Sequence, residues 1–125
     1  MAASARVVWV GRVISVLATL LFFLSAFMKL HGGPEVEKGF AHLSLPASML
    51  QPLAILELSC VAIYLIPATS VTGAILLTGY IGGAMCTHWR VGDPFFVHVG
   101  LGIFIWLGLY LREDRLKDLI PLRRG

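Results

Sequence analysis

The sequence predicts an all-α membrane protein, a bundle of four antiparallel transmembrane helices with a short amphipathic extracytoplasmic helix between the first and second. The first observation is composition, because 58% of the 125 residues are apolar and only 14% are charged. About a quarter of the residues in a soluble domain are charged. The mean hydropathy of +0.85 agrees with a membrane environment.

The second observation is a set of four apolar segments. As helices, each would reach roughly 25 to 35 Å, the thickness of a hydrocarbon core. The segments are residues 7–30, 47–66, 71–87 and 95–111. With their links they use nearly the whole chain, which predicts one domain over residues 1–125.

The first segment resembles a signal peptide at its start, where Arg6 and Arg12 precede apolar residues. However, its apolar run is longer than an ordinary signal sequence requires, and no A-x-A-like cleavage site follows it. We therefore expect a retained helix. Ser25 and Lys29 are four residues apart and share one face, which predicts a polar stripe at the outer end of this helix.

The link after the first segment contains the predicted amphipathic helix. Pro34 suits a first helical turn. Val36, Phe40 and Leu43 recur at i, i+4 and i+7, so one face is apolar and the other polar. Such a helix is expected to lie on the membrane surface.

The second segment, LQPLAILELSCVAIYLI, carries one carboxylate, Glu57, near its middle. A charged side chain at the centre of a membrane helix costs between about 3 and more than 10 kcal/mol, so Glu57 needs a proton, a partner or a polar cavity. Cys60 and Tyr64 follow Glu57 at i+3 and i+7 and share its face, which we expect to turn inward. Pro67 ends the helix, and the short link predicts an antiparallel neighbour.

The third segment is rich in small residues. Gly79 and Gly83 form one small-xxx-small strip, and Gly82 and Cys86 form a second. Such strips let helix backbones approach closely in lipid, so we expect close packing and an interface for a homo-oligomer. Further on, the tail REDRLKDLIPLRRG is expected to form a short helix at the cytoplasmic surface.

Basic residues predict the orientation. They gather at the two chain ends, at Arg6, Arg12, Arg112, Arg115, Lys117, Arg123 and Arg124. Because cytoplasmic flanks collect positive charge, both termini are expected to be cytoplasmic. The net charge of +3 reflects this topology and favours membrane lipids, with anionic headgroups, over nucleic acid as partners.

Other chemistry is not indicated. Cys60 and Cys86 are expected to be free, buried thiols, because their predicted depths differ by roughly 12 Å and a disulfide needs Cα atoms within about 7 Å. The histidine spacings match no zinc motif, and neither a nucleotide-binding glycine loop nor a nucleophile elbow is present. No metal site is predicted.

Three ionisable groups are expected to meet in the outer half of the bundle. Lys29 ends the first helix, His88 ends the third, and Glu57 lies about 10 Å below the outer edge of the second. Because Cα–Cβ bonds tilt toward a helix's amino end, all three side chains lean toward a common level. We take them as the candidate catalytic residues. The remaining candidates for the ligand-binding lining are Ser25, Tyr64, Tyr80, Cys86, Thr87 and His98.

The chain resembles the DoxX-like membrane proteins in GRVISVLATLLFFLSAFMKL, in the segment from EKGFAHLSLP to TGYIGGAMCTHWRVGDP, and in GLYLREDRLKDLIPLR. The resemblance implies a small four-helix bundle in a bacterial inner membrane. It also implies that Lys29, Glu57 and His88 form the polar core. Members of that family have been linked to membrane redox modules, including quinone-coupled oxidation.

We therefore favour a site for a lipophilic small molecule such as a quinone, in a subunit of a membrane oxidoreductase whose partner carries the electrons. No intrinsic cofactor is predicted. Three alternatives stay open. These are a cofactor-free isomerase or hydrolase with Glu57 as base and His88 or Lys29 as acid, a non-catalytic assembly or scaffolding subunit, and a proton-coupled transporter. The sequence does not decide whether the protein is an enzyme.

Overall fold

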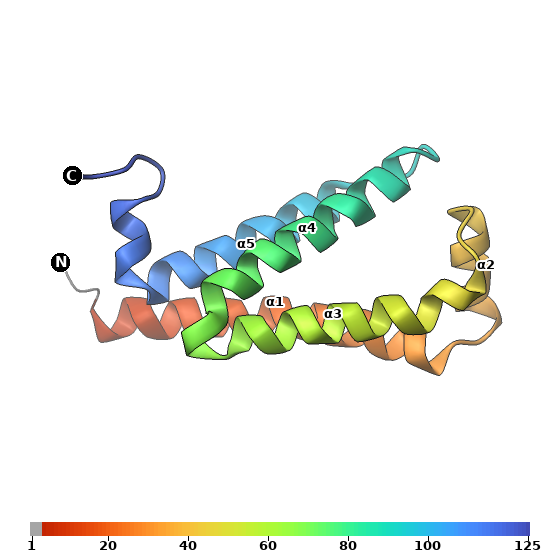
Figure 1. The fold of residues 1–125 in the computed structure, drawn as a ribbon, viewed down its shortest axis with the longest axis horizontal. Helices are drawn as coiled ribbons and strands as arrows, with labels where there is room; N and C mark the ends of the chain where they lie inside the picture. The colour runs from red at the N-terminus through yellow and green to blue at the C-terminus, as the bar shows by residue number, and fades with distance from the viewer. Residues whose placement is uncertain (1–3) are drawn as a thin grey trace.

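The computed structural model describes residues 4–125, and every regular element in that range is helical (Figure 1). The prediction of an all-α fold is confirmed. Four long helices begin and end within two residues of the predicted segments, once the turn before α3 is counted with it. They are α1 (Ala5–His31), α3 (Leu50–Leu65), α4 (Ser70–Trp89) and α5 (Phe96–Arg112).

The short elements lie in the links. The amphipathic helix is α2 (Pro34–His42), with Phe40 buried on its inner face. Three 3₁₀ turns complete the chain: η1 (Ala47–Met49), η2 (Pro67–Thr69) and η3 (Asp114–Asp118). The tail therefore forms a short helix as expected, and this helix is of the 3₁₀ type with Leu116 buried.

Each long helix packs on two others. α1 contacts α3 and α5, and α4 contacts the same two helices. In Figure 1, α4 and α5 lie over α1 and α3 and diverge from them toward the end that holds α2. Both chain ends lie at the opposite end, where the helices are closest. The two helix pairs are therefore farthest apart at the end where the polar residues were predicted to meet.

The boundary between α1 and α2 follows from two glycines. Gly32 and Gly33 have φ of 70° and 103°, a conformation that residues with a Cβ rarely adopt. Gly32 ends α1, its N–H bonding to the carbonyl of Met28, and Pro34 begins α2 with its φ already helical. The chain thus turns sharply after α1, and α2 lies across the end where the two helix pairs diverge (Figure 1).

Close helix approach occurs at three glycines outside the predicted strips. A Cβ on Gly11 of α1 would lie 2.7 Å from the carbonyl oxygen of Gly108 in α5, and one on Gly73 of α4 would overlap the backbone of Tyr64 in α3. The predicted close packing of Gly79, Gly82 and Gly83 within the chain was wrong, because a Cβ on any of them would meet nothing within 4 Å. These three glycines lie where α4 diverges, so they leave hollows.

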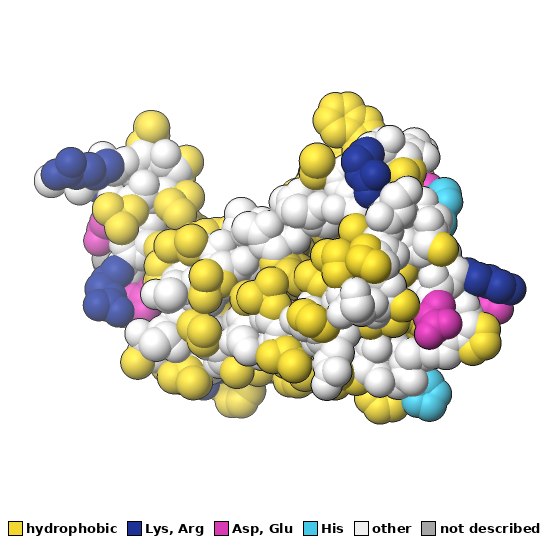
Figure 2. Space-filling view, turned by 45° about the vertical axis from the view of Figure 1, so that its right-hand side comes forward, with side chains coloured by type: hydrophobic (Ala, Val, Ile, Leu, Met, Phe, Trp, Pro, Cys, Tyr) yellow, Lys and Arg dark blue, Asp and Glu magenta, His cyan; other side chains and the backbone are white. Residues whose placement is uncertain are grey.

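The surface shows that this is a membrane protein. Large apolar side chains such as Leu17, Phe27 and Ile103 are more than half exposed, and Figure 2 shows hydrophobic side chains across the middle with charged ones at the two ends. Exposed apolar surface of this extent needs lipid around it. Three helical segments, 5–31, 47–65 and 67–89, are long and apolar enough to span a membrane, and α5 is a shorter apolar helix.

Candidate functional site

A buried ion pair joins α1 to α3. Lys29 Nζ lies 2.9 Å from Glu57 Oε2, with side chains 15% and 1% exposed. Glu57 faces inward as the helical spacing predicts, together with Cys60 and Tyr64. Each charge is therefore offset by the other, which is what a carboxylate in the middle of a membrane helix requires.

Three donors converge on the same carboxylate oxygen. Besides Lys29, the hydroxyl of Tyr80 donates to Glu57 Oε2 at 3.0 Å and that of Ser25 donates at 3.3 Å. Lys29 Nζ also donates to Ser25 Oγ at 2.6 Å, since the two residues lie one turn apart on α1. Glu57 is thus the common acceptor for side chains from α1 and α4, and it holds Lys29 in one position.

A polar cavity of about 160 Å³ lies above this cluster. Ser25, Lys29 and Tyr80 of the long helices line one side of the cavity. Phe40 of α2 and Leu43, the residue that caps α2, line another. Glu57 does not line the cavity, although three of its partners do. A bound molecule would therefore contact Lys29 and Tyr80, with the carboxylate behind them.

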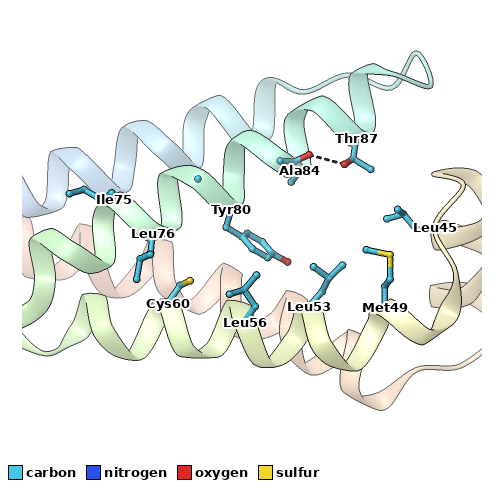
Figure 3. Close-up of a pocket in the computed structure, with 12 residues that line it drawn as sticks. Leu45, Met49, Leu53, Leu56, Cys60, Ile75, Leu76, Tyr80, Ala84 and Thr87 are labelled. Atoms are coloured by element: carbon cyan, nitrogen blue, oxygen red, sulfur yellow. Dashed lines mark hydrogen bonds between the residues drawn. The ribbon is translucent and has the colours of Figure 1, made fainter.

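An apolar groove of about 480 Å³ runs between α3 and α4 and meets the polar cavity. Figure 3 shows Tyr80 reaching from α4 toward α3, with Leu53 and Leu56 on the opposite wall. Tyr80 and Leu53 line both the groove and the cavity. The thiol of Cys60 lies farther along the groove, next to Leu76. A long apolar molecule can therefore lie in the groove with a polar head beside Lys29.

His88 lines the polar cavity but bonds away from Glu57. Its Nδ1 lies 3.3 Å from Asp93 Oδ2, and its ring centroid lies 4.9 Å from that of His98. Asp93 also accepts hydrogen bonds from His42 Nε2, at 2.9 and 3.0 Å to its two oxygens. These contacts tie the end of α2 to the turn between α4 and α5, and His88 is the member of this group that lines the cavity.

Comparison with protein families matches residues 13–110 to the DoxX-like family. The chain belongs to the DoxX-like family. The matched region runs from α1 to α5 and contains Lys29, Glu57 and His88. The resemblance seen in the sequence is thereby confirmed. Searches of curated proteins and of solved structures found no match.

Four of the predicted lining residues of this DoxX-like protein surround the polar cavity. They are Ser25, Tyr80, Thr87 and His98. The hydroxyl of Thr87 is engaged, because it donates to the carbonyl of Gly83 at 2.7 Å. Ser25 and Tyr80 are the lining residues that reach Glu57, and Tyr80 makes the contact from α4 that the sequence had suggested for His88.

Two of the predicted lining residues lie elsewhere. Tyr64 is seven residues from Glu57, about 10 Å along the helix, and its hydroxyl donates to the carbonyl of Ile105 at 2.7 Å and lies 3.0 Å from Ser15 Oγ. It therefore belongs to a separate polar cluster near the chain ends. Cys60 and Cys86 are free thiols as expected, but only Cys60 is buried; Cys86 is exposed on α4.

The sequence reasoning missed His42 and Asp93. Neither residue is among the candidate site residues, because Asp93 lies in a turn between Gly92 and Pro94 and His42 lies on the polar side of an amphipathic segment. The available signal was that Asp93 immediately follows the turn after His88. No such signal connects His42 to it, because the two residues are 51 positions apart. Among the residues that the structure describes, no group of three or more histidine, cysteine or acidic side chains is arranged to hold a metal.

The hydrogen bond between His42 and Asp93 predicts that α2 becomes more mobile in acid. The hydrogen bond from His42 lowers the pKa of Asp93 below its ordinary value, so the folded state binds this proton less readily than the unfolded state. The stabilising effect is complete above the unfolded pKa of about 4 and is lost as the pH falls through the lower folded pKa. Asp93→Asn should instead loosen α2 at every pH.

Fluorescence anisotropy of a dye on Glu35→Cys in a Cys86→Ser background would measure this loosening. The wild type should lose anisotropy in the acid range below about pH 4, while Asp93→Asn should start low and stay flat. The Asp93→Asn variant keeps the remaining charged residues of α2, so it controls for acid effects that do not involve Asp93. Superimposable curves for the two proteins would show that the contact does not hold α2.

Proposed function

We propose that this DoxX-like protein binds a lipophilic small molecule with an oxygen-bearing head, most simply a quinone, as a subunit of a membrane redox module. The observation that carries the proposal is the meeting of the apolar α3/α4 groove with the polar cavity at Tyr80. Ligand sites combine mostly apolar walls with a few convergent polar groups, and this pair of spaces has that character.

Lys29 supplies the fixed polar contact. Its ammonium has three N–H donors, two of which bond to Ser25 and Glu57. In the described part of the chain, no partner takes the third donor. A carbonyl oxygen in the cavity would accept it, and Glu57 would keep Lys29 charged and in place.

His88 and His98 are the groups suited to exchange protons with the head. Both line the polar cavity, and an imidazole ring has one nitrogen that donates and one that accepts when it is neutral. His88 also connects through Asp93 and His42 to the exposed surface. Electrons would come from a partner oxidoreductase, as the sequence reasoning suggested.

In the proposed setting, all four long helices cross a bacterial inner membrane as an antiparallel bundle, with α2 on the extracytoplasmic surface. Helix α5 has 17 residues and so reaches about 25 Å, the short end of the usual range. Both chain ends lie together (Figure 1), with basic residues beside them, which favours a cytoplasmic location for both.

Glu57→Gln tests the proposal. It keeps the side-chain volume but removes the charge that orients Lys29. Hydrogen bonds to charged groups contribute about 1.5–3 kcal/mol, so binding of a short-tailed benzoquinone should weaken at least about tenfold. The measurements are equilibrium dialysis in mild detergent and mass spectrometry of co-purified lipophilic molecules.

Tyr64→Phe is the matched control, because it removes a buried hydrogen bond outside the cavity and should leave quinone binding unchanged. Circular dichroism establishes that all three proteins fold. Equal, empty preparations of folded wild type and Glu57→Gln would remove the ligand proposal and favour an assembly subunit.

A further inference from the structure

We propose that the groove between α4 and α5 is a second binding site for a lipophilic molecule with a carbonyl or hydroxyl head. The groove has a volume of about 490 Å³, close to that of the α3/α4 groove. It lies on the other side of α4 and is walled mostly by apolar side chains, with Trp106 and His98 among them. The ligand class rests on the proposed function; the groove itself is a separate observation.

His98 provides the polar contact of this second groove. Neither of its ring nitrogens has a hydrogen-bond partner among residues 4–125, and Nδ1 is completely buried. Nε2 is the ring nitrogen left accessible. In lipid no water replaces a missing partner, so a ring nitrogen without one favours a ligand that can hydrogen-bond to it. An oxygen-bearing head on Nε2 would give the ring a partner that no side chain among residues 4–125 supplies.

The second groove shares a lining residue with the same polar cavity as the first. His98 lines both the α4/α5 groove and the cavity that contains Lys29, just as Tyr80 lines both the α3/α4 groove and that cavity. Two lipophilic molecules would then lie on opposite sides of α4, with their heads near one polar cavity.

The glycines of α4 create both grooves. Gly79 and Gly83 line the α3/α4 groove, and Gly82 lines the α4/α5 groove. A Cβ at any of these positions would meet nothing within 4 Å. Glycine is less favourable than alanine in a helix interior, so three unpacked glycines need another reason. Space for ligands on both faces of α4 supplies it.

Two substitutions on α4 block the grooves one at a time. Gly79→Leu fills the α3/α4 groove and Gly82→Leu fills the α4/α5 groove, and both should fold because the added atoms enter open space. Equilibrium dialysis with a short-tailed benzoquinone in mild detergent should find about two molecules per wild-type chain. Each variant should bind about half as many.

Trp106 identifies which groove is occupied. It lines the α4/α5 groove, and a bound quinone should quench its fluorescence in a Trp9→Phe, Trp89→Phe background. Saturable quenching should persist in Gly79→Leu and disappear in Gly82→Leu.

The outcomes separate the two proposals. About one molecule per wild-type chain, lost in Gly79→Leu and kept in Gly82→Leu, would overturn the second site and leave the proposed function standing. No binding by the wild type would overturn both. A detergent-solubilised dimer that Gly82→Leu converts to a monomer, with no quenching in the wild type, would show that a second copy of the chain covers the groove.

Discussion

Replacing Glu57 with leucine should destabilise the protein by about 3–5 kcal/mol, the usual cost of removing one member of a buried ion pair. The loss comes mainly from Lys29, whose side chain is 15% exposed and would keep its charge without a counterion. The hydroxyls of Tyr80 and Ser25 would also lose their acceptor. Unfolding in mixed detergent micelles would measure the change in free energy.

Adding Lys29→Met to Glu57→Leu should recover most of the lost stability. An apolar pair of similar volume avoids the desolvation of two charges, and such replacements are often neutral or stabilising. The double variant should still fail to bind the benzoquinone in the α3/α4 groove, because the Lys29 donor to its head is gone. A double variant that stayed as unstable as Glu57→Leu would mean that the loss reflects packing around residue 57 and not the stranded charge.

Gly73→Ala should be the most damaging small substitution, with a loss of about 3 kcal/mol. The added Cβ would overlap the backbone N and Cα of Tyr64, and backbone atoms cannot move aside as a flexible side chain can. The contact lies near the short link between α3 and α4, so relieving it would shift one helix against the other. Thermal unfolding of the purified protein measures the effect.

Gly79→Ala is the control on the same helix. Its Cβ would meet nothing within 4 Å, so only helix propensity changes, and stability should rise by about 0.5–1 kcal/mol. Equal effects at the two positions would contradict the helix crossing seen in the structure. The comparison also tests the finding that the α4 glycines border open grooves.

The location of the ion pair explains how a membrane protein tolerates a carboxylate at Glu57. The carboxylate does not line the cavity. Lys29 and Tyr80 do, and because both donate hydrogen bonds to Glu57, it sets their positions toward any bound molecule. Substitutions of Tyr80 or Lys29 therefore test a different role from substitutions of Glu57. The first two remove contacts with the ligand, whereas Glu57 positions those contacts.

The sequence by itself determined the elements and the inward face of α3. Hydropathy, helical spacing and the prolines Pro34 and Pro67 are local properties, so they predicted the helices, the membrane environment and the burial of Glu57, Cys60 and Tyr64. The approach of Lys29 to Glu57 also followed from depth along the helices, because a rise of about 1.5 Å per residue places both near one level.

Only the tertiary structure decided which side chains meet at that level. Depth does not specify how each helix is rotated or how far α4 diverges from α3, and these depend on contacts such as Gly73 against Tyr64. The divergence turned the α4 glycines from expected packing strips into grooves. The rotation brought Tyr80 to Glu57 and left His88 to pair with Asp93. Lateral position is a property of the assembled bundle, and no single segment encodes it.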